Sequence, residues 1–142
     1  MMQKHKIALD VGDVRIGVAV SDLLGITANP RETYVRKKND VDADIAYFCE
    51  YAKREDADAF VLGLPKNMDG TEGPRAEKAR QFKALLEEAS GLPVILWDER
   101  RSTIEAHAIL HAAGKKEKKH RANVDAVAAT LLLEGYLASP NR

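Results

Sequence analysis

Four acidic residues lie at points in the sequence where a charged side chain is costly to bury. Asp10 ends the apolar run of a predicted first strand, and Asp98 and Glu99 follow the apolar end of a predicted fifth strand. Asp125 lies in the first turn of a last helix that is apolar on nearly all sides, which indicates a buried helix. Burial of an unpaired charge is expensive, so these carboxylates need partners.

Each acid also has an ordinary structural interpretation. Asp10 can accept backbone N–H groups in the turn that follows it, and Asp98 and Glu99 fit an exposed loop before a helix cap. Asp125 suits the positive end of its helix dipole. Taken together, however, acids from three separate elements are expected to meet at one edge of the domain.

Clustered carboxylates repel one another unless a cation neutralises them. Their hard oxygen atoms suit Mg²⁺ or Mn²⁺. Two such ions about 4 Å apart can activate a water and stabilise the leaving oxygen during phosphodiester cleavage. The acids therefore predict a divalent-metal site, with Asp98 and Glu99 both open as the middle ligand.

Other catalytic chemistries have less support in the sequence. His107 and His111 are four residues apart on a predicted helix, but the zinc pattern H-E-x-x-H is absent. No Walker A or GxGxxG loop occurs. Ser102 and Glu105 form a predicted capping box, and Cys49 lies on the apolar stripe of a helix, where core packing is expected.

The elements that would position the acids follow from hydrophobic periodicity. Three strands open the chain, and Gly12-Asp13 suits a tight turn between the first two. Two α-β units and two final helices follow, in the order βββαβαβαα. The predicted strands are 6–11, 14–21, 31–36, 58–64 and 93–97, and the predicted helices are 41–54, 74–89, 103–113 and 122–137.

This order predicts an α/β fold with a mixed five-stranded sheet and helices on both faces. We expect residues 1–142 to form a single domain. With 45% apolar and 31% charged residues, the chain has an ordinary composition for a globular protein. Neither a signal peptide nor a membrane span is predicted, and one cysteine suits a reducing compartment, so we expect a cytoplasmic protein.

The formal net charge is zero, so clustering decides whether basic residues matter. Residues 115–121 hold five Lys or Arg and one Glu, and residues 36–38 form a smaller basic patch. Such runs are usually solvated surface.

Four stretches resemble, in order, the motifs of the YqgF-type (RuvX) family. Its members are described as Holliday junction resolvases and as nucleases that mature the 5′ end of pre-16S ribosomal RNA. The stretches are I-A-L-D-V-G-D-V-R-I-G-V-A-V-S-D, V-L-G-L-P-K-N-M-D-G-T-E-G-P-R-A-E-K-A-R, W-D-E-R-R-S-T-I-E-A and N-V-D-A-V-A-A-T-L-L-L-E-G-Y-L. Together they span nearly the whole chain.

The resemblance implies a ribonuclease H-like fold and a metal-dependent endonuclease that uses Mg²⁺ or Mn²⁺. The ligands it implies are Asp10, Glu99 and Asp125, with Asp98 as the second choice beside Glu99. One departure concerns the first turn, where the family more often has Thr-Lys and this chain has Asp13-Val14. The change removes a positive charge beside the expected phosphate path.

The resemblance also gives the basic residues a role in binding nucleic acid, either pre-rRNA or branched DNA. The expected contacts are Arg15, Lys66, Arg75, Arg100, Lys118, Lys119 and Arg121. Three alternatives stay open: a junction resolvase, an RNA-binding module of the same fold that does not cut, and, less favoured, a nucleotide-binding lobe. The small ribosomal subunit is a possible partner, a membrane is not expected, and both a monomer and a weak homodimer are compatible with the sequence.

Overall fold

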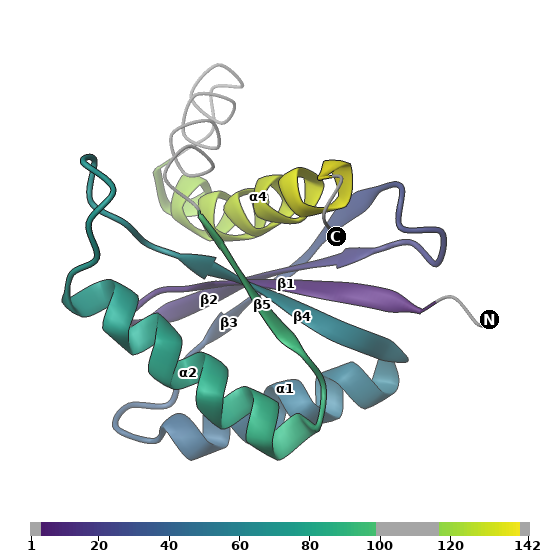
Figure 1. Ribbon diagram of the computed structural model, residues 1–142, viewed down its shortest axis with the longest axis horizontal. Helices are drawn as coiled ribbons and strands as arrows, with labels where there is room; N and C mark the ends of the chain where they lie inside the picture. Colours follow the sequence, from purple (N-terminus) through teal and green to yellow (C-terminus); the bar gives the residue numbers. More distant parts are fainter. Residues whose placement is uncertain (1–3, 99–116, 140–142) are drawn as a thin grey trace.

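A twisted five-stranded sheet with helices on both faces organises the protein (Figure 1). The computed structural model describes residues 4–98 and 117–139, and only the backbone of residues 117–124. The strands are β1 (His5–Val11), β2 (Arg15–Ser21), β3 (Ala28–Val35), β4 (Ala57–Leu64) and β5 (Val94–Asp98). The described helices are α1 (Val41–Arg54), α2 (Pro74–Ser90) and α4 (Glu117–Ala138).

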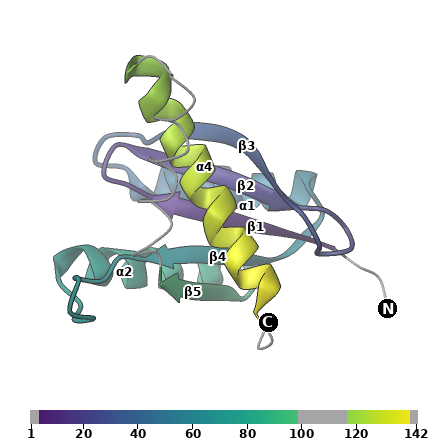
Figure 2. The same cartoon turned by 90° about the horizontal axis from the view of Figure 1, so that it is seen from above.

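The sheet combines an antiparallel and a parallel half in the order β3-β2-β1-β4-β5. Strands β1, β2 and β3 form an antiparallel meander, whereas β4 runs parallel to β1 and β5 parallel to β4. Helices α1 and α2 cover one face and α4 crosses the other (Figures 1 and 2). The predicted mixed sheet with helices on both faces is confirmed.

The observed helix ends follow local capping signals. The side chain of Asp40 accepts the N–H of Ala43 at 3.1 Å, which starts α1 where the sequence predicts it. Helix α2 ends at Gly91, whose φ of 72° is the left-handed conformation that glycine adopts readily. None of the described helices is long and apolar enough to span a membrane.

The last helix differs from its predicted start. Helix α4 begins at Glu117, ahead of the predicted position at Ala122. The basic run was interpreted as a connecting segment, but Lys, Arg and Glu are good helix formers and extend a helix readily. The helix predicted at 103–113 lies outside the described residues.

Two hydrophobic cores lie on the two faces of the sheet. Large side chains such as Leu9 and Ile16 meet Phe48 and Phe82 beneath α1 and α2. On the other face, small or β-branched strand residues pack against the apolar side of α4: Ala8, Ala19 and Val61 against Ala129, Leu132, Leu133 and Tyr136. The small side chains under α4 allow the helix to approach the sheet closely.

The closest approach between α4 and the sheet occurs at Gly17 of β2. A Cβ atom added there would lie 1.9 Å from the backbone oxygen of Asp125 and 2.3 Å from its carbonyl carbon. These separations are far below van der Waals contact, so only glycine fits at this position. Gly17 therefore sets how deep α4 lies on β2 at Asp125, eight residues after the helix begins.

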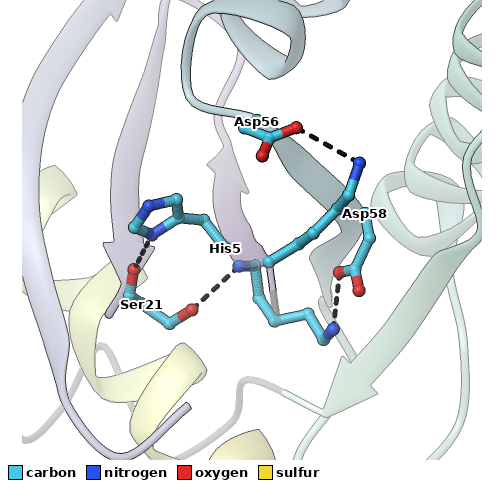
Figure 3. Close-up of polar contacts among 6 residues, drawn as sticks. His5, Ser21, Asp56 and Asp58 are labelled. Carbon is cyan, nitrogen blue, oxygen red and sulfur yellow. Dashed lines mark hydrogen bonds and ion pairs between the residues drawn. The ribbon is translucent and has the colours of Figure 1, made fainter. Parts of the chain in front are cut away.

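Polar contacts hold the opposite end of β1. His5 Nδ1 donates to the carbonyl of Ser21, and the hydroxyl of Ser21 accepts the backbone N–H of Lys6 at 2.8 Å (Figure 3). Ion pairs from Lys4 and Lys6 reach Asp56 and Asp58 in and beside β4. These contacts fix β1 between its neighbours at the end remote from Asp10.

Replacement of Gly17 by alanine is expected to lower the free energy of unfolding by about 2–3 kcal/mol or more, because the methyl group displaces α4. Urea unfolding monitored by circular dichroism measures the loss. The matched control is Gly73→Ala, where the nearest atom to the new Cβ is 3.7 Å away. Its expected cost is under about 1 kcal/mol, from a weaker helix cap. Equal losses in both variants would contradict the close contact.

Candidate active site

Asp10 and Asp125 belong to the same face of the sheet. Side chains alternate along a strand, and Ala8 packs beneath α4, so Asp10, two residues later, projects toward α4 as well. Asp10 is paired across the strands with Gly17, the residue on which the backbone of Asp125 rests. The structure thus brings together two acids that are 115 positions apart in the sequence.

Asp125 is already paired with a cation. The Nε atom of Arg15 donates to Oδ2 of Asp125 at 2.7 Å, and the two side chains are 36% and 21% exposed. Arg15 begins β2, so this ion pair joins the start of that strand to α4. The carboxylate of Asp125 thus already binds one positively charged group in this structure.

Asp98 projects from the other face of the sheet. Its neighbour Trp97 lies beneath α4, with its ring 5.8 Å from that of Tyr136 and its Nε1 3.1 Å from a Cβ position at Gly135. By strand alternation the exposed side chain of Asp98 therefore points away from α4. Glu99, the other candidate, lies outside the described residues.

The donor set suits a hard divalent cation. Asp10 and Asp125 supply carboxylate oxygens, the ligands that Mg²⁺ and Mn²⁺ prefer. Both residues are half-buried, which strengthens their attraction for a cation relative to a fully solvated position. No group of three His, Cys, Asp or Glu that could hold a metal occurs in the described part of the chain, which does not include Glu99.

The turn after Asp10 differs slightly from its prediction. The N–H of Gly12 donates to the carbonyl of Arg15 at 2.8 Å, so the two residues between them, Asp13 and Val14, form the turn. Gly12 does not have the positive φ that suggested a Gly12-Asp13 turn. Glycine is needed there because a Cβ would lie 2.9 Å from the Arg15 carbonyl oxygen.

A buried ion pair anchors this turn from the other side of the sheet. Asp44 of α1 is fully buried and accepts Arg36 Nε at 2.9 Å, the hydroxyl of Tyr34 at 2.9 Å and the N–H of Lys37 at 3.1 Å. Arg36 Nη1 donates to the carbonyl of Gly12 at 2.9 Å. The chain of contacts therefore runs from α1 to the turn that follows Asp10.

Sequence reasoning missed this pair, since Arg36 was interpreted as part of a solvated patch. A signal was available, because Asp44 lies four residues before Phe48 and eight before Ala52, both buried. That spacing puts Asp44 on the core face of α1. An acid on a core face calls for a basic partner.

Tyr34 shows the effect of this environment. Burial, together with the hydrogen bond to Asp44, raises the pKa of its hydroxyl to about 12. The phenol therefore stays protonated at neutral pH, where its hydroxyl donates to Asp44.

The basic residues expected to contact nucleic acid have separate positions. Arg15 belongs to the acidic site, whereas the half-buried Lys66 begins the loop after β4 and the exposed Arg75 lies on α2. Arg100 and the side chains of Lys118, Lys119 and Arg121 lie outside the described residues. The structure thus gathers only part of the predicted set near the acids.

The loop after β4 is an internally bonded turn. Asn67 N–H donates to the carbonyl of Thr71 at 2.8 Å, and Asp69 Oδ1 accepts both the N–H and the hydroxyl of Thr71. Gly70 has a φ of 89°, which glycine adopts without strain. Hydrogen bonds among its own residues therefore hold this loop in shape.

Comparison with known proteins assigns the family. A family model described as "RuvX: Holliday junction resolvase" matches residues 4–139. The chain belongs to the RuvX family. A relative from Halothermothrix orenii is 43% identical over 134 residues, which is 94% of both chains, and carries the name "Putative pre-16S rRNA nuclease". A relative from Bacillus subtilis with the same name is 41% identical over 95% of this chain and 98% of its own.

The fold itself resembles that of a solved RuvC structure. A solved structure of T. thermophilus RuvC in complex with a Holliday junction substrate matches with a TM-score of 0.55 and 18% identity, covering 95% of this chain and 96% of that one. At this identity the likeness concerns the fold alone. The fold is ribonuclease H-like, as the motifs of the RuvX family imply.

Replacement of Asp44 by alanine is expected to lower the free energy of unfolding by about 3–5 kcal/mol, because it leaves Arg36 without its carboxylate in a largely buried position. Equilibrium urea denaturation measures this. Asp42→Ala, which removes an exposed acid from the first turn of the same helix, is the control and should cost under about 1 kcal/mol. A loss for Asp44→Ala no larger than for the control would refute the anchoring role.

Proposed function

We propose that this protein is a metal-dependent endonuclease that hydrolyses phosphodiester bonds in structured nucleic acid, with the 5′ end of pre-16S rRNA as its substrate. The observation that carries the proposal is that Asp10 on β1 lies next to Asp125 on α4, with Arg15 bound to Asp125. Nuclease names among relatives over 40% identical and almost equally long support it.

Asp10, Glu99 and Asp125 are the proposed ligands of Mg²⁺ or Mn²⁺. When bound, such ions activate a water and stabilise the leaving oxygen. Glu99 is favoured over Asp98 because the exposed side chain of Asp98 projects away from α4 and from the face on which Asp10 lies. The carboxylates hold the cations, and the Gly12 turn keeps Asp10 in place.

Arg15 has a second role in this proposal. Before a divalent ion arrives, its guanidinium neutralises Asp125 and keeps that carboxylate oriented. A cation held by Asp125 would compete with Arg15 for this carboxylate, and the guanidinium of Arg15, once released, would be free to donate to a phosphate of the substrate. Metal binding and substrate binding are thereby coupled through one side chain.

The remaining basic residues position the backbone of the nucleic acid. Lys66 and Arg75, with Arg100, Lys118, Lys119 and Arg121, are proposed to contact phosphates, which orient a strand without reading its sequence. Binding should weaken as salt rises, because each phosphate contact releases a counterion. We further propose that residues 1–142 form one domain that works in the cytoplasm on precursors of the small ribosomal subunit.

A junction resolvase is the second candidate function. The printed description of the matching family names that activity, and the solved RuvC structure contains a junction. A resolvase acts on two strands, which calls for a symmetric pair of active sites. The names of the most similar relatives favour RNA, and the cleavage assay below includes both substrates.

With Mn²⁺, the wild-type protein is expected to cut a pre-16S rRNA fragment at its 5′ side, and Asp10→Asn is expected to reduce the rate by at least about 10²-fold, because a metal ligand is lost. Gel analysis of end-labelled substrate gives the rates, with a four-way DNA junction run in parallel. Asp42→Asn, an exposed acid on α1, serves as the control and should match wild type. Cleavage that survives in Asp10→Asn would remove Asp10 from the site.

The strand alternation also distinguishes the two adjacent acids. Glu99→Gln is expected to lose activity as severely as Asp10→Asn, whereas Asp98→Asn should keep at least about half of it, since its side chain projects from the other face. The same end-labelled RNA assay measures both. The opposite ranking would show that Asp98 is the ligand.

Arg15→Gln is expected to tighten Mn²⁺ binding roughly three- to tenfold, because a competing positive charge is removed from Asp125. Electron paramagnetic resonance of free Mn²⁺ measures the dissociation constant without any substrate. Arg31→Gln, which breaks a remote ion pair to Glu55, is the matched control and should leave the constant unchanged. Unchanged or weaker binding in Arg15→Gln would refute the competition.

A further inference from the structure

A pocket of about 240 Å³ lies on the side of the first turn that faces α1 and α2. Val11, Gly12 and Asp13 form one wall, and α2 contributes Arg75 and Lys78. Because Val11 directly follows Asp10, this pocket and the candidate active site lie on opposite faces of the same sheet edge. A nucleic-acid strand that crosses this edge would reach both.

Arg36 is held in the pocket in a fixed orientation. Its Nε and Nη1 atoms donate to Asp44 and to the carbonyl of Gly12, and its guanidinium carbon lies 5.7 Å from the centre of the Phe82 ring. Within the described part of the chain, Nη2 contacts no acceptor, and no buried side-chain nitrogen there lacks a partner. Nη2 is therefore not completely buried, and it can donate to a ligand that enters the pocket.

Two further cations lie at the rim of the pocket on the same side of α2. Arg75 and Lys78 are three residues apart, so they project side by side from the helix, and both are exposed. Lys78 Nζ is 3.9 Å from Asp13, and both side chains are over 70% exposed. A pair so long and so solvated contributes little, so Lys78 can turn to another anion at small cost.

The size and lining of the pocket limit its occupant. Three cations, Arg36, Arg75 and Lys78, face Asp13 and the buried Asp44, which leaves an excess of positive charge. The apolar wall comes from Val11 and Phe82. The volume is below the roughly 300–1,000 Å³ of pockets for drug-sized ligands, so one phosphate with its sugar fits better than a complete cofactor.

We propose that this pocket is a second phosphate-binding site, which holds a backbone phosphate of the nucleic-acid strand whose neighbouring segment lies at Asp10 and Asp125. Arg36 donates from a fixed position, and Arg75 and Lys78 close on the phosphate from α2. The proposal rests on the proposed nuclease function only in naming nucleic acid as the source of the phosphate.

The unusual residue of the first turn, Asp13, lies at the rim of this pocket. Where RuvX-type sequences more often have Thr-Lys, this chain has Asp13-Val14, and Asp13 pairs with Lys78 across the pocket. An acid at the rim weakens phosphate binding by occupying Lys78 and by repelling the ligand. Removal of this one charge should therefore strengthen binding.

A metal-free titration tests the site with the full chain. A 5′-phosphorylated RNA tetranucleotide is added to the ¹⁵N-labelled protein in EDTA, and amide shifts of Gly12, Asp13 and Lys78 report occupancy. Arg75→Ala and Lys78→Ala are expected to raise the dissociation constant of the RNA roughly three- to tenfold. Asp13→Asn is expected to lower it by a similar factor. Lys53→Ala, which removes an exposed cation from the far end of α1, should change nothing.

RNA binding must become weaker in Lys78→Ala and stronger in Asp13→Asn. Equal affinities in wild type, Lys78→Ala and Asp13→Asn, or shifts confined to other surfaces, would overturn the proposal. The outcome is separate from that of the cleavage assay. Pocket binding without Asp10-dependent cleavage would refute the nuclease function alone, and Asp10-dependent cleavage with unaltered affinities would refute the second phosphate site alone.

Discussion

The contact between Gly17 and the backbone of α4 at Asp125 is the constraint on which the rest of the structure depends. An added Cβ at Gly17 would lie 1.9 Å from the Asp125 backbone, so β2 must have glycine for α4 to lie at this depth. Gly17 is the cross-strand partner of Asp10. The same close approach that buries the apolar side of α4 therefore brings its acid over the acid of β1, and packing and site geometry have one cause.

The turn after Asp10 connects two charged systems on opposite faces of the sheet. On the α4 face, Arg15 is bound to the carboxylate of Asp125, and on the other face Arg36 is bound to the buried Asp44 and to the carbonyl of Gly12. Arg15 ties the end of this turn to α4, and Arg36 ties its beginning to α1, each through short, directional hydrogen bonds. Such support from both sides keeps a site in position, which preorganised binding of a cation or phosphate requires.

Much of the fold could be predicted from periodicity, because alternating and helical apolar patterns mark β1, β2, α1 and α2 directly. The start of α4 was missed, since charge was interpreted as a loop signal although Lys and Arg favour helices. Asp10 and Asp125 stood out as acids in apolar surroundings. Their pairing with Gly17 and Arg15 depends on long-range register, and Asp44 was overlooked because its partner lies outside its own helix.

The central claim is that Asp10 and Asp125 hold a divalent cation in competition with Arg15. An anomalous difference map from crystals grown with Mn²⁺ tests it most directly. We predict a peak roughly 2.0–2.3 Å from carboxylate oxygens of both Asp10 and Asp125, with the guanidinium of Arg15 moved away from Oδ2. A map with no peak between these carboxylates and an intact Arg15–Asp125 hydrogen bond would contradict the account.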